Sequence, residues 1–153
     1  MSTNPDYDPL VISVAVPLEP EQAFRLFTAG IDQWWPSGSH SVTGEGSRPT
    51  FETRIGGRIY EVGADGTEHT WGTIESIEPP DRVAFTWHPG REPETAQLVE
   101  VVFVSRGEET VLTLTQTGWA ALGNRAAETR RGYETGWKIV LAERFADSAK
   151  ARH

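Results

Sequence analysis

Few residues of this sequence are of a type that could do chemistry, and the clearest candidate is one glutamate. Glu61 lies between Tyr60 and Val62 in a strand-like stretch, so one of two alternating sets must face inward. If Ile59 and Glu61 face inward, the carboxylate lies in an apolar interior that raises its pKa, and it could bind a cation or act as an acid or base. If the other set faces inward, Glu61 lies in water. The residues leave both interpretations open.

The four histidines predict neither a metal site nor a nucleophile. His40, His69, His88 and His153 show none of the H-x-x-H, H-x-x-x-H or H-E-x-x-H spacings. No G-x-S-x-G motif and no glycine-rich phosphate loop is present, and there is no cysteine for a disulfide, a thiolate or a zinc–thiolate site. We therefore expect no metal and no cofactor. His69 and His88 flank strands that carry tryptophans, where a histidine either orients a ligand or simply lies at the surface.

Six tryptophans are the other notable residues. Trp71, Trp87 and Trp137 fit a core between a sheet and a helix, and as cavity walls they would stack on an aromatic or sterol-like ligand. Trp34 and Trp35 are adjacent on a short helical piece and cannot both point inward. One of the two is expected to face a cavity mouth or a partner, such as a second copy in a homodimer.

Composition and charge exclude several classes of protein. The chain has 153 residues, 37% hydrophobic and 24% charged, which indicates one globular domain. A net charge of −8 argues against binding to nucleic acid or to anionic membranes. Residues 1–9 do not have the pattern of a signal peptide, and no apolar run is long enough to span a membrane. The expected location is the cytoplasm.

The elements that must position these residues follow from hydrophobic periodicity. An apolar strand at 10–16 precedes two short helices at 20–28 and 31–35, and a loop rich in serine and glycine covers 36–49. Six strands joined by hairpins follow, with Gly56-Gly57 as a two-residue turn of positive φ, and a long helix from Asn124 to about 148 ends the domain. The predicted fold is α+β, with seven mostly antiparallel strands in a domain at 10–148 between tails at 1–9 and 149–153. The six later strands are predicted at 50–55, 58–62, 69–78, 82–87, 97–105 and 110–117.

Two glycines in the final helix need a reason, because each costs about 1 kcal/mol in a helix interior. The apolar stripe of this helix faces the sheet, and Gly136 belongs to it. Either Gly132 and Gly136 allow close helix–sheet approach, or Gly136 leaves space that widens a cavity. The stripe consists of Tyr133, Gly136, Trp137, Val140 and Leu141.

This order of elements resembles the helix-grip fold of the START-like (SRPBCC) superfamily, and more narrowly the homologues of the activator of heat-shock-protein-90 ATPase. The resemblance covers about residues 10–147 and implies a curved sheet wrapped around the long helix with a hydrophobic cavity between them. The superfamily includes lipid and hormone carriers, polyketide cyclases and aromatases, and cochaperone domains. The motifs that carry it are Ala23-Phe24, Trp34-Trp35-Pro36, Gly56-Gly57, Trp71-Gly72, Ile77-Glu78-Pro79-Pro80, Phe85-Thr86-Trp87 and Gly136-Trp137.

The sequence therefore predicts binding of a small apolar or amphipathic molecule in an internal cavity. A cyclase-, aromatase- or hydrolase-like enzyme that uses the same cavity is the first alternative, with Glu61 or a histidine moving protons. A protein-interaction domain with a chaperone partner is the second. The residues expected to line the cavity are Phe27, Trp34, Phe51, Glu61, Trp71, Phe85, Trp87, Val101, Phe103, Trp137 and Leu141.

Overall fold

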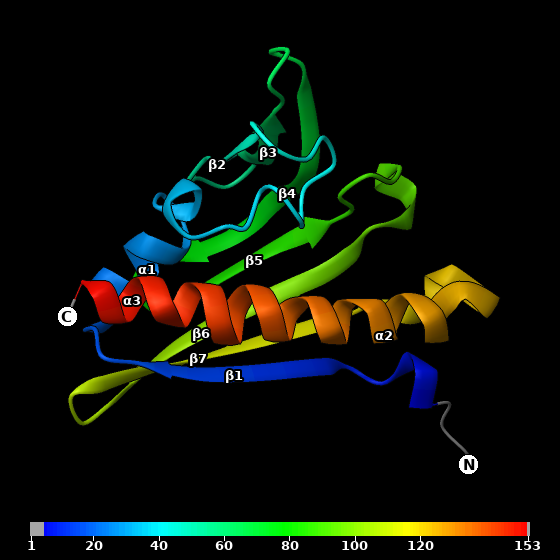
Figure 1. The fold of residues 1–153 in the computed structure, drawn as a ribbon. Helices are drawn as coiled ribbons and strands as arrows, with labels where there is room; N and C mark the ends of the chain where they lie inside the picture. Colours follow the sequence, from blue (N-terminus) through cyan, green and yellow to red (C-terminus); the bar gives the residue numbers. More distant parts are fainter. Residues whose placement is uncertain (1–4, 153) are drawn as a thin grey trace.

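The computed structural model describes residues 5–152, and its main element is one curved sheet of seven strands (Figure 1). The strand order is β1-β7-β6-β5-β4-β3-β2, and every neighbouring pair is antiparallel, which confirms the predicted sheet. The first four residues of the expected N-terminal tail and His153 lie outside the described part. The strands are β1 (Leu10–Val16), β2 (Arg48–Phe51), β3 (Arg58–Val62), β4 (Glu68–Glu78), β5 (Arg82–Trp87), β6 (Gln97–Arg106) and β7 (Glu109–Thr117).

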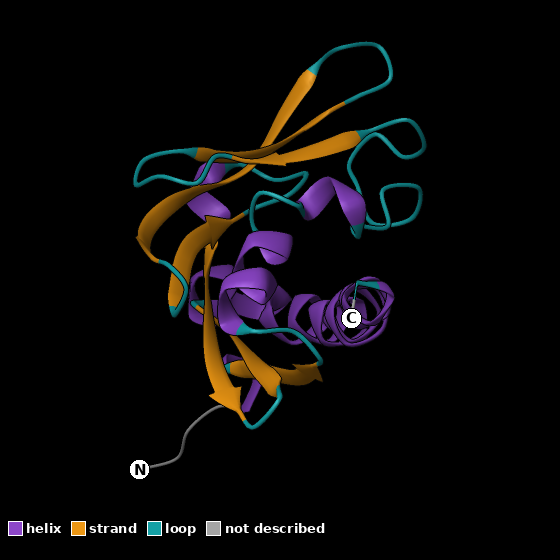
Figure 2. Ribbon diagram, turned by 90° about the vertical axis from the view of Figure 1, so that its left-hand side faces the viewer, coloured by secondary structure: helices purple, strands orange, loops and turns teal. Residues whose placement is uncertain are grey.

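One long helical segment crosses the concave face of the sheet, and Figure 2 looks almost along it, with the strands curling around it. This segment consists of a 3₁₀ turn η4 (Trp119–Arg125), α2 (Ala126–Trp137), a π-helical stretch η5 (Lys138–Phe145) and α3 (Ala146–Ala151). A shorter helix, α1 (Pro20–Phe27), and the turn η2 (Ile31–Gln33) follow β1. Short 3₁₀ turns also lie at η1 (Pro5–Tyr7) and η3 (Pro93–Thr95). The helix-grip architecture is thus confirmed.

Three local predictions were wrong. The Gly56-Gly57 pair is not a two-residue hairpin turn, because β2 ends at Phe51 and six residues connect it to β3. Only Gly56 has a positive φ, of 81°, while Gly57 packs so close to the backbone of Glu52 that a Cβ would lie 2.8 Å from its carbonyl oxygen. The final α-helix begins after Arg125 instead of being capped by Asn124. It also continues to Ala151, past the expected end, because Ala149 is fully buried.

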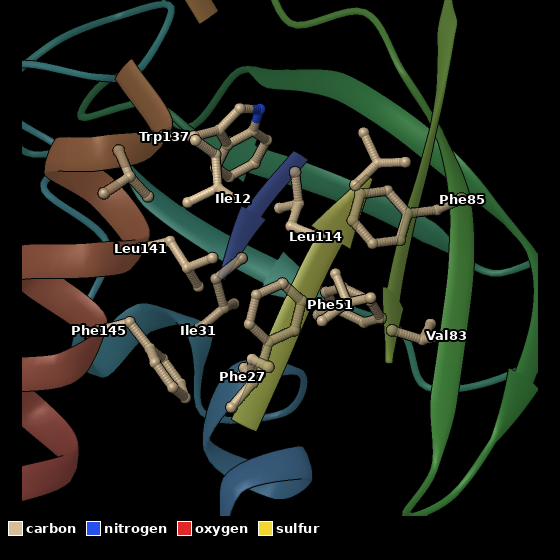
Figure 3. Packing of buried hydrophobic residues seen from close by; sticks show 14 of the residues in the cluster. Ile12, Phe27, Ile31, Phe51, Val83, Phe85, Leu114, Trp137, Leu141 and Phe145 are labelled. Carbon is tan, nitrogen blue, oxygen red and sulfur yellow. The ribbon is translucent and has the colours of Figure 1, made fainter. Parts of the chain in front are cut away.

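The core lies between the concave face of the sheet and the helices. Side chains alternate along each strand, so β6, for example, buries Val99, Val101 and Phe103 on its inner side. Figure 3 shows side chains from α1, the sheet and the long helix converging on one another, among them Phe27, Phe51 and Phe145. Within residues 5–152, no helix is long and apolar enough to cross a membrane.

Gly72 on β4 lies against the backbone of β5. A Cβ at this position would lie 1.7 Å from the carbonyl oxygen of Thr86 on β5, so no other residue fits without moving the backbone. The pairing of β3 with β4 and of β4 with β5 shifts register on either side of this position. Such irregularities bend a strand, and they help β4 to curl over the helix.

We expect Gly72→Ala to lower the free energy of unfolding by about 3 kcal/mol, because the added methyl group collides with backbone that cannot move aside. Urea denaturation followed by circular dichroism measures the change. Gly132→Ala is the matched control: a Cβ there meets nothing within 4 Å, so this variant should be about 0.5–1 kcal/mol more stable than the wild type. Equal stability of the two variants would contradict the close approach at Gly72.

Candidate functional site

A small apolar cleft opens at one end of the interior, between the long helix and the loops that follow η2 and β5. Its volume is about 110 Å³, well below the roughly 300–1,000 Å³ of typical ligand pockets. Its walls are mainly aromatic and aliphatic. The cleft is lined by Trp35, His40, Trp87, Pro89, Tyr133, Gly136, Trp137 and Val140.

Three indole rings from three different elements form the main walls of the cleft. Trp87 ends β5, Trp137 ends α2, and their ring centroids are 5.5 Å apart. Trp35 follows η2, with its ring centroid 5.9 Å from that of Trp87 and 6.1 Å from that of Trp137. These separations and tilts are those at which aromatic rings attract one another.

Gly136 is the reason that the cleft exists. A Cβ at Gly136 would meet nothing within 4 Å, and the same holds at Gly132, so neither glycine serves close helix–sheet approach. Of the two interpretations of these glycines, the structure favours open space. At Gly136 this space is part of the cleft, beside the ring of Trp137.

Trp34 and Trp35 point in different directions, as expected for adjacent indoles. Trp34 is buried and donates its ring N–H to the carbonyl oxygen of Leu26 at 2.8 Å. Trp35 is half-buried over the cleft and donates its ring N–H to the carbonyl oxygen of His40 at 2.9 Å. Trp35 thus closes the inner end of the cleft, where its centroid lies 4.9 Å from that of Trp71.

Glu61 faces inward and is fully buried, which settles the register of β3. One carboxylate oxygen accepts the backbone N–H of Val42 at 2.6 Å and the indole N–H of Trp71 at 2.8 Å. The other accepts the backbone N–H and the hydroxyl of Thr43, at 3.0 and 2.7 Å. Four donors therefore hold this carboxylate, and through it the loop between η2 and β2 is tied to the sheet.

The expectation of a raised pKa for an inward-facing Glu61 was wrong. Burial alone raises the pKa of the carboxyl, but the hydrogen bonds from Thr43, Val42 and Trp71 outweigh it and hold the pKa below its usual range. Glu61 therefore stays ionised at neutral pH, with its oxygens occupied. This arrangement suits an anchor and not a proton donor.

The sequence did not predict a polar pair formed by the cleft residue Tyr133 and by Arg91, which lies behind it. Arg91, in the loop after β5, donates to the hydroxyl oxygen of Tyr133 on α2 at 3.0 Å. Burial raises the pKa of Tyr133 above its ordinary value, and the nearby guanidinium of Arg91 opposes this only in part. The two residues are 42 positions apart, and the loop of Arg91 has no periodic pattern, so the sequence contained no signal for the pair.

Comparison with known proteins places this fold in a family. Residues 17–149 match the family described as "Activator of Hsp90 ATPase homolog 1-like protein". The chain belongs to this family. No protein of curated function matches the sequence.

Solved structures agree with this family membership. The anthrahydroquino-γ-pyrone synthase Txn09 is 30% identical, with 95% of this chain and 99% of that chain covered and a TM-score of 0.62. Protein MLL2253 from Mesorhizobium loti is 17% identical over 92% of this chain and 96% of its own, with a TM-score of 0.68. DynU16, from the dynemicin biosynthetic locus, is 18% identical with a TM-score of 0.68, and this chain spans 46% of its length. The last two show the fold alone.

Relative to the cavity that this family resemblance implies, the predicted lining residues divide into two groups. Trp87 and Trp137 line the cleft, and Trp71 and Glu61 lie directly behind Trp35. The others pack against one another in the interior, where Phe27, for instance, lies 5.9 Å from Phe103 between ring centroids. This second group consists of Phe27, Trp34, Phe51, Phe85, Val101, Phe103 and Leu141, and their side chains fill the space that a larger cavity would need.

The described histidines occupy three different settings. His40 lines the cleft, and its Nδ1 lies 2.7 Å from the hydroxyl of Ser39. His88 is buried, with Nδ1 3.1 Å from the carbonyl oxygen of Arg91, and His69 lies at the half-buried edge of β4. Among the residues that the structure describes, no group of three or more histidines and carboxylates is placed to hold a metal ion.

We expect Glu61→Gln to lower the free energy of unfolding by about 2–3 kcal/mol at neutral pH. The amide nitrogen that replaces one oxygen cannot accept the donors facing it. Either the N–H groups of Val42 and Trp71, or the N–H and hydroxyl of Thr43, therefore lose their partner. Urea denaturation measures the loss, and amide hydrogen exchange at Val42 and Thr43 should accelerate. Glu75→Gln, an exposed substitution on β4, is the control and should change neither.

The same anchor makes stability depend on pH. Because the pKa of Glu61 is lower in the folded protein than in the unfolded chain, the carboxylate stabilises the fold above about pH 4.5, its ordinary value. That stabilisation is lost as the pH falls through the lower, folded value. Between about pH 5 and pH 3 the stability of the wild type should therefore fall more steeply than that of Glu61→Gln. Parallel stability–pH curves would show that Glu61 is not the group that titrates.

Proposed function

We propose that this protein binds a small, flat aromatic molecule in the cleft between Trp35, Trp87 and Trp137. The observation that carries the proposal is an apolar opening walled by three indoles, next to a glycine whose missing side chain leaves it empty. Indole faces stack on aromatic ligands, and an apolar cleft with few polar groups is the usual form of a small-molecule site. The filled interior behind the cleft limits the ligand to what this end of the fold can hold.

The size of the cleft defines how such a ligand would bind. An enclosed apolar cavity of about 150 Å³ holds one benzene ring, so about 110 Å³ with an open side accommodates one ring or the edge of a larger ring system. A ligand with more rings would need the space that Trp35 occupies. Trp35 is half-buried and held by one hydrogen bond to the loop, whereas Val42 and Thr43 further along are tied to Glu61. A larger ligand would therefore have to displace a ring that packs against Trp71, which is itself bonded to Glu61.

A second candidate is an enzyme that acts on a polycyclic aromatic substrate. It is supported by the 30% identity to a synthase named for an anthrahydroquino-γ-pyrone, over nearly the whole length of both chains. At the cleft of this chain, His40 and Tyr133 carry exchangeable protons. Glu61, the residue first considered for acid–base work, has both oxygens engaged by donors and does not suit this role.

Titration with naphthalene, phenanthrene and fluorene, followed by tryptophan fluorescence, tests the binding site. We expect saturable quenching in the wild type and at least tenfold weaker binding in Gly136→Leu, because the new side chain occupies the cleft. Thr135→Leu adds the same side chain at an exposed neighbouring position and should bind like the wild type. Equal binding by Gly136→Leu, or no saturable change with any compound, would contradict the proposal. Mass spectrometry of a recovered ligand separates the two candidates, since only an enzyme alters it.

A further inference from the structure

An arginine that contacts the cleft residue Tyr133 forms no ion pair with a carboxylate within the described residues. Arg91 is half-buried, and its guanidinium donates to the carbonyl oxygens of Thr95 and Trp87, at 2.7 and 3.2 Å, and to the side-chain oxygen of Gln97 at 2.6 Å. All of these acceptors are neutral oxygens. The positive charge is therefore fixed in place by neutral groups and remains available to act on what lies next to it.

Tyr133 connects Arg91 to the cleft through a hydrogen bond. Its hydroxyl oxygen accepts an N–H of Arg91 at 3.0 Å, so its own proton must point to a different acceptor. Among residues 5–152 no acceptor lies within hydrogen-bond distance of that proton. The phenol stays protonated at neutral pH, because burial raises its pKa. Tyr133 thus offers the cleft an O–H donor that the guanidinium behind it makes stronger.

A second donor without an acceptor belongs to the same cleft. The indole nitrogen of Trp87 is buried and has no hydrogen-bond partner, although buried polar groups are nearly always paired. Trp87 lines the cleft together with Tyr133. The indole nitrogen itself is covered by protein, so the donor that this apolar surface offers to an acceptor-bearing ligand is the hydroxyl of Tyr133.

We propose that the cleft selects planar aromatic molecules that carry a ketone or phenolate oxygen, and that Tyr133 determines this specificity by donating its hydroxyl hydrogen bond to that oxygen. Arg91 is a positioning residue: it orients the phenol and favours partial or full negative charge on the ligand oxygen. This inference rests on the proposed binding of flat aromatic molecules in the cleft, and adds to it the functional group that the ligand carries.

The test compares 9-fluorenone with fluorene, two flat tricyclic compounds that differ in a ketone against a methylene group. Tryptophan fluorescence titration, corrected for absorption by the ligand, measures the dissociation constants with wild type, Tyr133→Phe and Tyr60→Phe. One hydrogen bond from a polarised donor should make the wild type bind fluorenone roughly fivefold to tenfold tighter than fluorene. Tyr133→Phe should bind fluorenone as weakly as fluorene, with fluorene binding unchanged. Tyr60, on β3 beneath Arg58, lies away from the cleft, and its variant should keep the wild-type preference.

The possible outcomes separate this inference from the function on which it rests. Binding of neither compound by the wild type overturns both. Equal affinity of the wild type for the two compounds overturns only the role of the ketone. An equal loss of affinity for both compounds in Tyr133→Phe does the same, because it would show that the ring of Tyr133 packs against the ligand while its hydroxyl forms no specific hydrogen bond. The indole N–H signals of Trp87 and Trp137 in a nitrogen–proton correlation spectrum supply a second measurement on the unmodified protein. They should shift with both compounds, because both rings line the cleft.

Discussion

The structure depends on how the concave face of a strongly curved sheet is filled. The space between seven curved strands and one helical segment must be filled by side chains. Any part left empty destabilises the fold, because the atoms that line it lose dispersion contacts. Aromatic side chains fill most of it here: Phe27 alone lies within 6.5 Å of Trp34, Phe51, Phe103 and Phe145 between ring centroids. The filling stops at Gly136, where the helix offers no side chain. The cleft therefore lies where Gly136 leaves a space between the large side chains of Trp35, Trp87 and Trp137.

The buried carboxylate of Glu61 is constrained by its charge and not by its volume. An ionised group in this interior is tolerated only when its hydrogen-bonding capacity is satisfied, and four donors satisfy it. Three of them come from two adjacent residues of one loop, so the same contacts that keep Glu61 charged also fix that loop over the sheet. Trp71, which supplies the fourth, packs against Trp35 at 4.9 Å between ring centroids. The polar anchor and the aromatic wall of the cleft are therefore parts of one packed unit.

The sequence predicted the sheet well because alternation of apolar residues is local, and β1, β3 and β5 begin and end at the predicted residues. It could not place Gly57, whose conformation is set by the close backbone of Glu52, a contact made only in the folded loop. The facing of Glu61 was undecided because both alternating sets of β3 contain apolar residues, and the decisive donors are 18 and 19 positions away. The pairing of Arg91 with Tyr133 spans 42 positions and depends on how the helix lies across the sheet.

The packed core and the apolar cleft occupy different parts of the concave face. At the end near α1 and α3, phenylalanines and aliphatic residues pack in an apolar core, where removing a side chain lowers the free energy of unfolding. At the end near Gly136, the wall contains Tyr133, whose hydroxyl oxygen accepts an N–H of Arg91, and Trp87, whose buried indole nitrogen has no partner. An unpaired buried donor such as this nitrogen destabilises the fold slightly. Under the proposed function, the packed end would stay constant while the residues around the cleft determine which molecule is accepted.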